Sequence, residues 1–305
     1  MTDAGDASFS LTHEVGHGLE VRVGGVPIAS YSYDGDLPAL ESPKPYLHPL
    51  RTLSGAVVSA YRPWDHPWHK GLQMTASVLS GQNFWGGGTY TDGEYVVQDN
   101  IGRIRHDSFT ALRVRDDEAT VRETLSWITA RGERWLEEER TLRFWGADPA
   151  EGVWVLDFET RLRNVRGSSL RLGSPTTLGR PDAGYGGFFW RGPRSWTGAE
   201  IVAPGGEGGE AMRGRSADWL AIAGRHDGID GGATVLMFAG TSSGMEPLSW
   251  FVRSTPFAAL NPSPSFHREV AIVPGEALEL RHRLVIADRM WGRAEVEERA
   301  QRHAL

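Results

Sequence analysis

The chain of 305 residues contains no cysteine. Disulfide bonds, thiolate catalysis and cysteine-ligated metal sites are therefore excluded. Lysine is almost as rare, because Lys44 and Lys70 are the only two and the other basic side chains are arginines. The net charge is −7, so the chain lacks the basic excess that phosphate recognition requires. Nucleic acid is not expected as a partner.

Long apolar runs are also missing. No stretch approaches the roughly 20 apolar residues that cross a bilayer as a helix, so no membrane association is expected. Residues 1–6 are polar and acidic and lack the basic start and apolar centre of a secretion signal. We therefore expect a cytoplasmic protein. Its 40% apolar content suits a sizeable core, and we expect one domain over residues 1–305.

Apolar and polar residues alternate with a period of two along most of the chain, which is typical of half-buried strands. Residues 19–23 and 26–31 flank a Gly24-Gly25 turn, which is a hairpin signal. One helix is expected, over residues 293–303. Further strands are expected at 55–61, 72–79, 119–128, 135–145, 153–162, 169–172, 234–239, 249–253 and 278–286. The pattern predicts an all-β fold, a large antiparallel β-sandwich with a short C-terminal helix.

A run of glutamates falls on the expected strand 135–145. Glu137, Glu138 and Glu139 are consecutive there, and Glu133 precedes them. Charged side chains are rarely buried unless they are paired. We expect a solvated strand face at this position.

The densest group of polar and aromatic side chains lies at residues 64–71. This segment holds Asp65, His66 and His69 together with Trp64 and Trp68, and His48 lies shortly before it. Sugars are bound by flat aromatic rings, which stack on their C–H surfaces, and by polar groups, which bind their hydroxyls. The segment therefore predicts a sugar-handling site.

The candidate catalytic residues are His66, His69, Asp65 and His48. Histidine titrates near neutral pH, so these rings can act as general acid and base. Alternatively, His48, His66 and His69, with Asp65, would hold a divalent metal ion such as zinc or manganese, although their spacing matches no specific metal motif. A third alternative is structural, with the rings bonded to loop carbonyls in a proline-rich turn.

Two further clusters, at residues 83–88 and 184–192, place aromatic residues beside glycines. Glycine lets a ligand approach the backbone closely, and an arginine offers a planar fork to hydroxyls or a carboxylate. For each tryptophan the alternative is a place in the core. The predicted substrate-binding residues are Arg51, Trp68, Lys70, Trp85, Tyr185, Trp190 and Arg191.

Residues 43–50, 65–72 and 83–85 together resemble the bacterial PmoA family, proteins of unknown function that are often labelled methane oxygenase. The resemblance extends over most of the chain, through residues 184–191, 216–219 and 250–254. It implies a place in sugar catabolism, because the family is associated with neighbourhoods that include sugar oxidoreductases. The label itself implies an oxygenase-linked metal protein. A subunit of the particulate methane oxygenase would be embedded in a membrane, however, and no spanning segment occurs here.

The chain also resembles, more distantly, the aldose 1-epimerase or galactose mutarotase-like sandwich. His69-Lys70-Gly71, Phe84-Trp85 and residues 274–276 carry this resemblance, which implies a β-supersandwich. A mutarotase carries a glutamate base before that last turn, and residues 257–263 contain none. Simple mutarotation is therefore not implied, and fold alone does not determine function.

These observations favour a carbohydrate-active enzyme that transfers a proton on a sugar or glycoside, including keto-sugars. Epimerisation, elimination and glycoside cleavage all need a base, an acid and a group that stabilises developing negative charge. The alternative is a non-catalytic sugar-binding or sensing protein, and the oxygenase-linked metal protein is least favoured. The expected partner is a small carbohydrate. An exposed edge strand would allow two copies to pair as a homodimer.

Overall fold

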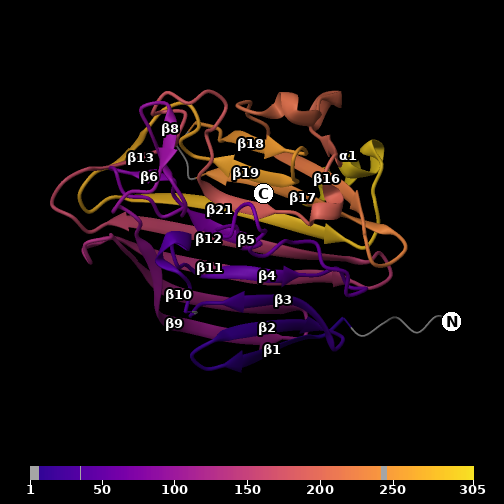
Figure 1. Ribbon diagram of the computed structural model, residues 1–305. Helices are drawn as coiled ribbons and strands as arrows, with labels where there is room; N and C mark the ends of the chain where they lie inside the picture. The colour runs from indigo at the N-terminus through magenta and orange to yellow at the C-terminus, as the bar shows by residue number, and fades with distance from the viewer. Residues whose placement is uncertain (1–6, 35, 242–245) are drawn as a thin grey trace.

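The computed structural model describes residues 7–34, 36–241 and 246–305 (Figure 1). Two eight-stranded antiparallel sheets dominate the chain, and one short helix lies near the C-terminus. The predicted all-β, antiparallel fold with a C-terminal helix is confirmed. The single domain expected over residues 1–305 stays a prediction.

The first sheet carries the segments that matter for the site. Its strands, in spatial order, are β1 (Phe9–Glu14), β2 (Gly18–Val23), β3 (Val26–Ser32), β4 (Tyr46–Leu50), β5 (Leu72–Thr75), β14 (Gly187–Arg191), β19 (Ala259–Ser263) and β18 (Ser249–Arg253). Gly24 and Gly25 join β2 to β3 with φ angles of 53° and 81°, which glycine adopts without strain, so the predicted hairpin is confirmed. Strand β14 lies between β5 and β19 and brings three distant parts of the chain together.

The second sheet supplies the other half of the sandwich. Its strands, in spatial order, are β15 (Glu200–Val202), β16 (Trp219–Arg225), β17 (Gly232–Thr241), β21 (Ala277–Ala287), β12 (Val153–Asn164), β11 (Arg134–Asp148), β10 (Glu118–Ile128) and β9 (Arg103–Arg115). The two sheets pack through a shared apolar core. Phe188 of β14 lies on Phe158 of β12, with ring centroids 4.8 Å apart. Burial of one such side chain contributes roughly 1.5–3 kcal/mol, so many such contacts hold the sheets together.

Smaller elements complete the fold. They are β6 (Val78–Leu79), β13 (Leu170–Gly173) and β20 (Val270–Ile272) in a three-stranded sheet, the hairpin β7 (Thr89–Thr91) and β8 (Glu94–Val96), the short turns η1 (Ala39–Glu41), η2 (Arg194–Trp196), η3 (Pro204–Gly206) and η4 (Gly209–Met212), and the helix α1 (Arg293–Arg302). The helix agrees with the prediction to within one residue. Within the described ranges, no helix is long and apolar enough to cross a membrane.

The strand expected at residues 55–61 is not formed. This segment makes only isolated bridges, at Val57 and Tyr61. A turn begins it instead, because Thr52 Oγ1 accepts the backbone N–H of Ala56 at 3.1 Å and Gly55 has a φ of 90°. The prediction from residue alternation was wrong here because local hydrogen bonds competed with strand pairing.

The glutamate run behaves differently at alternate positions. Glu139 is exposed and Glu137 half-buried, as expected of a solvated face, but Glu138 is fully buried. Its carboxylate accepts hydrogen bonds from Arg140 Nε at 2.7 Å, Trp127 Nε1 at 2.8 Å and Thr160 Oγ1 at 2.9 Å. The expectation was wrong for Glu138 because side chains alternate between the two faces of a strand, and three donors compensate its loss of hydration.

Candidate functional site

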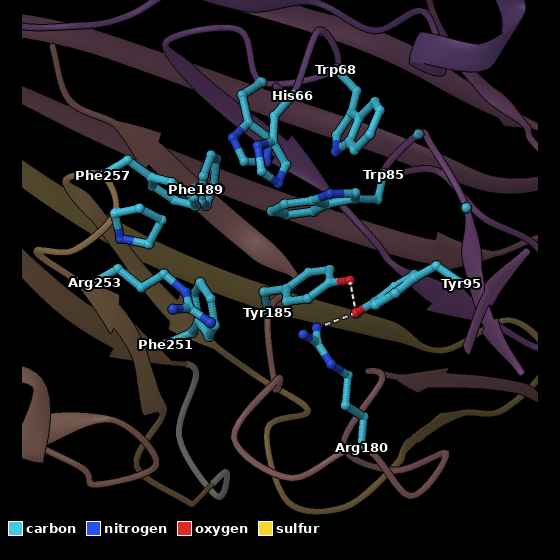
Figure 2. A pocket seen from close by; sticks show the side chains of 14 residues that line it. His66, Trp68, Trp85, Tyr95, Arg180, Tyr185, Phe189, Phe251, Arg253 and Phe257 are labelled. Atoms are coloured by element: carbon cyan, nitrogen blue, oxygen red, sulfur yellow. Dashed lines mark hydrogen bonds between the residues drawn. The ribbon is translucent and has the colours of Figure 1, made fainter. Parts of the chain in front are cut away.

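A pocket of about 420 Å³ opens beside the first sheet (Figure 2). All its lining residues come from this sheet, from the β7–β8 hairpin or from connecting loops, and none comes from the second sheet. They are His66, Trp68, His69, Trp85, Gly86, Gly88, Tyr95, Arg180, Tyr185, Phe189, Phe251, Arg253, Pro256 and Phe257. The volume lies in the range typical of small-molecule sites.

Five of the predicted site residues meet in this pocket. His66, Trp68 and His69 come from the loop before β5, Trp85 from the β6–β7 loop, and Tyr185 from the loop before β14. Trp85 packs on Tyr185, with ring centroids 4.6 Å apart. The segment at 64–71 and the two glycine-aromatic clusters thus lie side by side, although they are far apart in the sequence.

Two consecutive turns place the histidine rings. The backbone N–H of His66 bonds the carbonyl of Pro63 at 2.9 Å, and that of His69 bonds the carbonyl of His66 at 3.0 Å. The two imidazoles consequently stack, with centroids 4.7 Å apart and planes 20° from parallel. Two ionisable groups at this separation disfavour each other's charged form.

His69 is buried and has a defined tautomer. Its Nδ1 lies 3.2 Å from Nη1 of Arg191. A guanidinium only donates hydrogen bonds, so Nδ1 accepts and the ring proton sits on Nε2. Burial lowers the pKa of His69 well below its usual value, and the charge that His66 carries when protonated and the charge of Arg191 lower it further. At neutral pH this ring is an uncharged imidazole with an Nε2–H donor.

His66 has a carboxylate as its partner and is expected in the opposite tautomer to His69. Its Nδ1 lies 3.1 Å from Oδ2 of Asp65, an ion-pair distance without hydrogen-bond alignment. A carboxylate only accepts, so it favours the proton on Nδ1 and leaves the lone pair on Nε2. Burial lowers the pKa of His66, and Asp65 opposes that shift. This ring is therefore also uncharged near pH 7, with an accepting Nε2.

Asp65 and Arg191 act from behind the histidines and do not line the pocket. Asp65 also accepts a hydrogen bond from Arg194 at 3.1 Å, and its Oδ1 lies 3.9 Å from Arg191. Burial raises the pKa of Asp65, but His66 and Arg191, together with a backbone hydrogen bond, hold it below its usual value. Arg191 is 1% exposed, and its guanidinium lies 3.6 Å from the centroid of Phe257. The two residues position the rings rather than the ligand.

Lys70, predicted to bind substrate, lies outside the lining. It is fully buried and its Nζ donates to the carboxylate of Glu41 and, at 3.0 Å, to the carbonyl of Pro67. Glu41 also pairs with Arg62. Lys44 Nζ donates to the carbonyls of Glu41 and Trp85, each at 3.1 Å. Both lysines of the chain thus hold the loops of the pocket wall together.

His48, Arg51 and Trp190 are likewise not brought to the pocket. His48 Nδ1 bonds Ser59 Oγ at 2.8 Å, and burial lowers the pKa of His48 to about 4. Arg51 donates to the carbonyl of Gly55 at 2.9 Å. Trp190 is fully buried in the core, with Nε1 bonded to the carbonyl of Val58 at 3.0 Å.

The three histidines considered as metal ligands do not form a set. Over the part of the chain that the structure describes, no group of three or more His, Asp or Glu side chains is arranged to hold a metal ion. His48 bonds Ser59 and stacks on Tyr61, whereas His66 and His69 stack on each other. His48 therefore does not complete a metal-binding set with His66 and His69. The geometry of the pair suits acid–base chemistry instead.

Several lining residues were not anticipated from the sequence. Arg180 and Arg253 line the side of the pocket opposite His66, with Tyr95 beside Arg180 (Figure 2). Tyr95 accepts a hydrogen bond from Arg180, and its hydroxyl lies 2.7 Å from that of Tyr185. Arg253 falls in the segment 250–254 that carries part of the family resemblance, and this was its only sequence signal. Arg180 has none, because it stands alone in a loop.

The chain belongs to a family of unknown function, DUF6807, whose model matches residues 18–301. No curated protein matches the sequence. The chain is similar to a GH36 α-galactosidase from Geobacillus stearothermophilus, at 12% identity and a TM-score of 0.42, over 99% of this chain and 42% of that chain. It thus spans less than half the length of that galactosidase.

Two epimerase structures are also similar. The galactose 1-epimerase from Lactobacillus acidophilus matches at 8% identity and a TM-score of 0.40, over 92% of this chain and 98% of that chain. A putative aldose 1-epimerase from Klebsiella pneumoniae matches at 10% identity and a TM-score of 0.37, over 96% and 82%. These neighbours belong to the class that the more distant sequence resemblance indicated. Likenesses this distant do not indicate an activity, so the activity has to be inferred from the pocket.

Proposed function

We propose that this chain is a carbohydrate-active enzyme that transfers a proton on a bound sugar, with His66 as general base and His69 as hydrogen-bond donor or acid. One observation carries the proposal: two imidazoles stack at the pocket, His66 beside the Asp65 carboxylate and His69 beside the Arg191 guanidinium, and these partners favour opposite tautomers. His66 presents a lone pair, and His69 presents an N–H. A base and an acid side by side are what proton transfer next to a carbonyl or hydroxyl requires.

The remaining lining suits a sugar. Trp85, Phe189 and Phe257 offer apolar faces to C–H surfaces and pack around the buried ring of His69. A weakly hydrated site strengthens the interaction of the His69 N–H with an oxygen that gains negative charge. Epimerisation, elimination and glycoside cleavage all remain consistent with this pair.

The test is turnover by His66→Ala and His69→Ala on a substrate found by screening sugars, glycosides and keto-sugars. Loss of a positioned acid or base costs roughly 10²–10⁴-fold in rate, so kcat is expected to fall by that much in each variant. His17→Ala is the matched control, because His17 is exposed in the β1–β2 turn. Full kcat in His66→Ala, with normal folding by circular dichroism, would refute the assignment.

A non-catalytic sugar-binding protein is the second candidate, and the aromatic lining favours it. Trp68, Trp85 and Tyr185 would bind a sugar by stacking without any proton transfer. That alternative predicts ligand-induced thermal stabilisation with no product. The PmoA resemblance, the oxygenase-linked metal protein that it implies, the cytoplasmic location and the homodimer stay predictions. Elemental analysis and size-exclusion chromatography address the metal and the dimer.

A further inference from the structure

The side of the pocket opposite His66 carries two positive charges, on Arg180 and Arg253 (Figure 2). They come from different elements, since Arg180 lies in the loop between β13 and β14, and Arg253 ends β18. Both side chains are half-buried. None of the 14 lining residues is an aspartate or a glutamate.

The contacts of these arginines within the described residues are aromatic or hydroxylic. Arg180 donates to the hydroxyl of Tyr95 and lies over that ring, 4.8 Å from its centroid. Arg253 lies over the ring of Phe251, 5.4 Å from its centroid. A tyrosine ring and hydroxyl solvate a cation but do not neutralise it. The charge on this side of the pocket is therefore unbalanced.

Two carboxylates near the pocket, those of Glu210 and Asp65, are already engaged. Glu210 binds Arg213 and accepts the backbone N–H groups of Ser254 and Thr255, each at 2.9 Å. Asp65 serves His66 and Arg194 on the opposite side. Burial lowers the pKa of Arg253 and the charge of Arg213 lowers it further, whereas Glu210 opposes this shift and Arg180 adds to it.

We propose that the ligand of this pocket is an acidic sugar, whose anionic group lies at Arg180 and Arg253 while its hydroxyls face His66 and His69. This inference rests on the proposed function, because it takes the pocket to hold a carbohydrate. Guanidinium groups bind carboxylates and phosphates through charge-assisted hydrogen bonds. The hydroxyls of a neutral sugar can accept hydrogen bonds from these guanidinium groups but bring no negative charge, so a neutral sugar compensates the desolvation of the two cations less fully than an acidic one.

The test is isothermal titration calorimetry with glucuronate and galacturonate, with glucose and galactose as their neutral counterparts, and with glucose 6-phosphate. Acidic sugars are expected to bind at least about tenfold more tightly than neutral ones, and the preference is expected to shrink as salt rises. Tighter binding of glucose 6-phosphate than of the uronates would identify the anion as a phosphate, and the reverse would identify it as a carboxylate.

Arg180→Gln and Arg253→Gln are each expected to weaken binding of the preferred acidic sugar roughly 10- to 100-fold, because each removes a charge-assisted contact. Affinity for neutral sugars should stay within about twofold. Arg253→Lys keeps the charge and should retain part of the preference. Arg171→Gln is the control, because Arg171 pairs with Glu269 on the surface, outside the pocket.

The outcomes separate the two proposals. Equal affinity for acidic and neutral sugars, or an equal loss for both in the arginine variants, overturns the acidic-sugar inference and leaves proton transfer by the histidines standing. Selective binding of acidic sugars with full turnover in His66→Ala overturns the catalytic proposal alone. No binding by any of these sugars overturns the acidic-sugar inference, and a screen of sugars, glycosides and keto-sugars that yields neither binding nor product overturns both.

Discussion

Each histidine of the pocket has a charged partner within the protein, whereas Arg180 and Arg253 have no carboxylate paired with them among the described residues. His66 has Asp65 at 3.1 Å and His69 has Arg191 at 3.2 Å, so each ring is held from behind. Arg180 and Arg253 have aromatic and hydroxyl neighbours instead of carboxylates. Fixed imidazole rings suit catalysis, because proton transfer depends on their tautomer and orientation. Arginines without a carboxylate partner suit ligand recognition, because an anionic ligand can supply the missing negative charge.

The largest effect that would sharpen this comparison is expected from Arg191→Gln. It removes the donor that holds Nδ1 of His69, so the ring is free to change tautomer and kcat should fall about 10- to 100-fold with little change in KM. Steady-state kinetics and thermal unfolding measure the two consequences separately. Arg191→Lys keeps a cation near the ring and should recover part of the rate. If Arg191→Gln changed KM alone, Arg191 would contribute to ligand binding and not to the orientation of His69.

A smaller effect is expected from Asp65→Asn, and it lies in the pH profile. Rate depends on uncharged His66, so it falls as pH drops through the pKa of His66, which burial holds below its usual value. Asp65 raises that pKa, so its removal lowers the pKa and moves the acid limb to lower pH. The dependence of kcat/KM on pH measures the shift. An acid limb that moves upward would contradict the assignment of His66 as base.

The smallest effect is expected from His48→Asn. His48 lies outside the lining and bonds Ser59, which the asparagine amide can still reach. Turnover should stay within about twofold of the wild type, since changes away from such features are nearly neutral. A tenfold loss of kcat would mean that the histidine side extends to His48.

The histidine side of the pocket was easier to predict from the sequence than the arginine side. His66 and His69 stand in one loop, so their proximity could be seen directly along the chain. Arg180 and Arg253 are 73 positions apart and reach one side of the pocket because β14, β19 and β18 are consecutive in the first sheet. Strand order of this kind depends on long-range packing, which a single sequence does not display.

Two incorrect placements have equally physical reasons. Trp190 was expected at the ligand because it follows the aromatic Phe188 and Phe189, but alternation along β14 turns Phe189 to the pocket and its two neighbours to the core. Lys70 was expected at the ligand because it adjoins His69. Its partner Glu41 lies 29 positions earlier, in a turn that no local pattern of ours predicted. Strand alternation itself was the reliable signal, and it predicted most of the large strands.

The pocket draws no lining residue from the second sheet, and this division has an evolutionary consequence. Selection for a ligand acts on the loops and strands of one sheet, while the other is constrained by packing and solubility. New specificity can arise by changes in the β13–β14 loop, which carries Arg180, or in the β7–β8 hairpin, which carries Tyr95, while β9 to β12 keep their sequence. Descendants of one ancestor can thus acquire different ligands without rebuilding the sandwich.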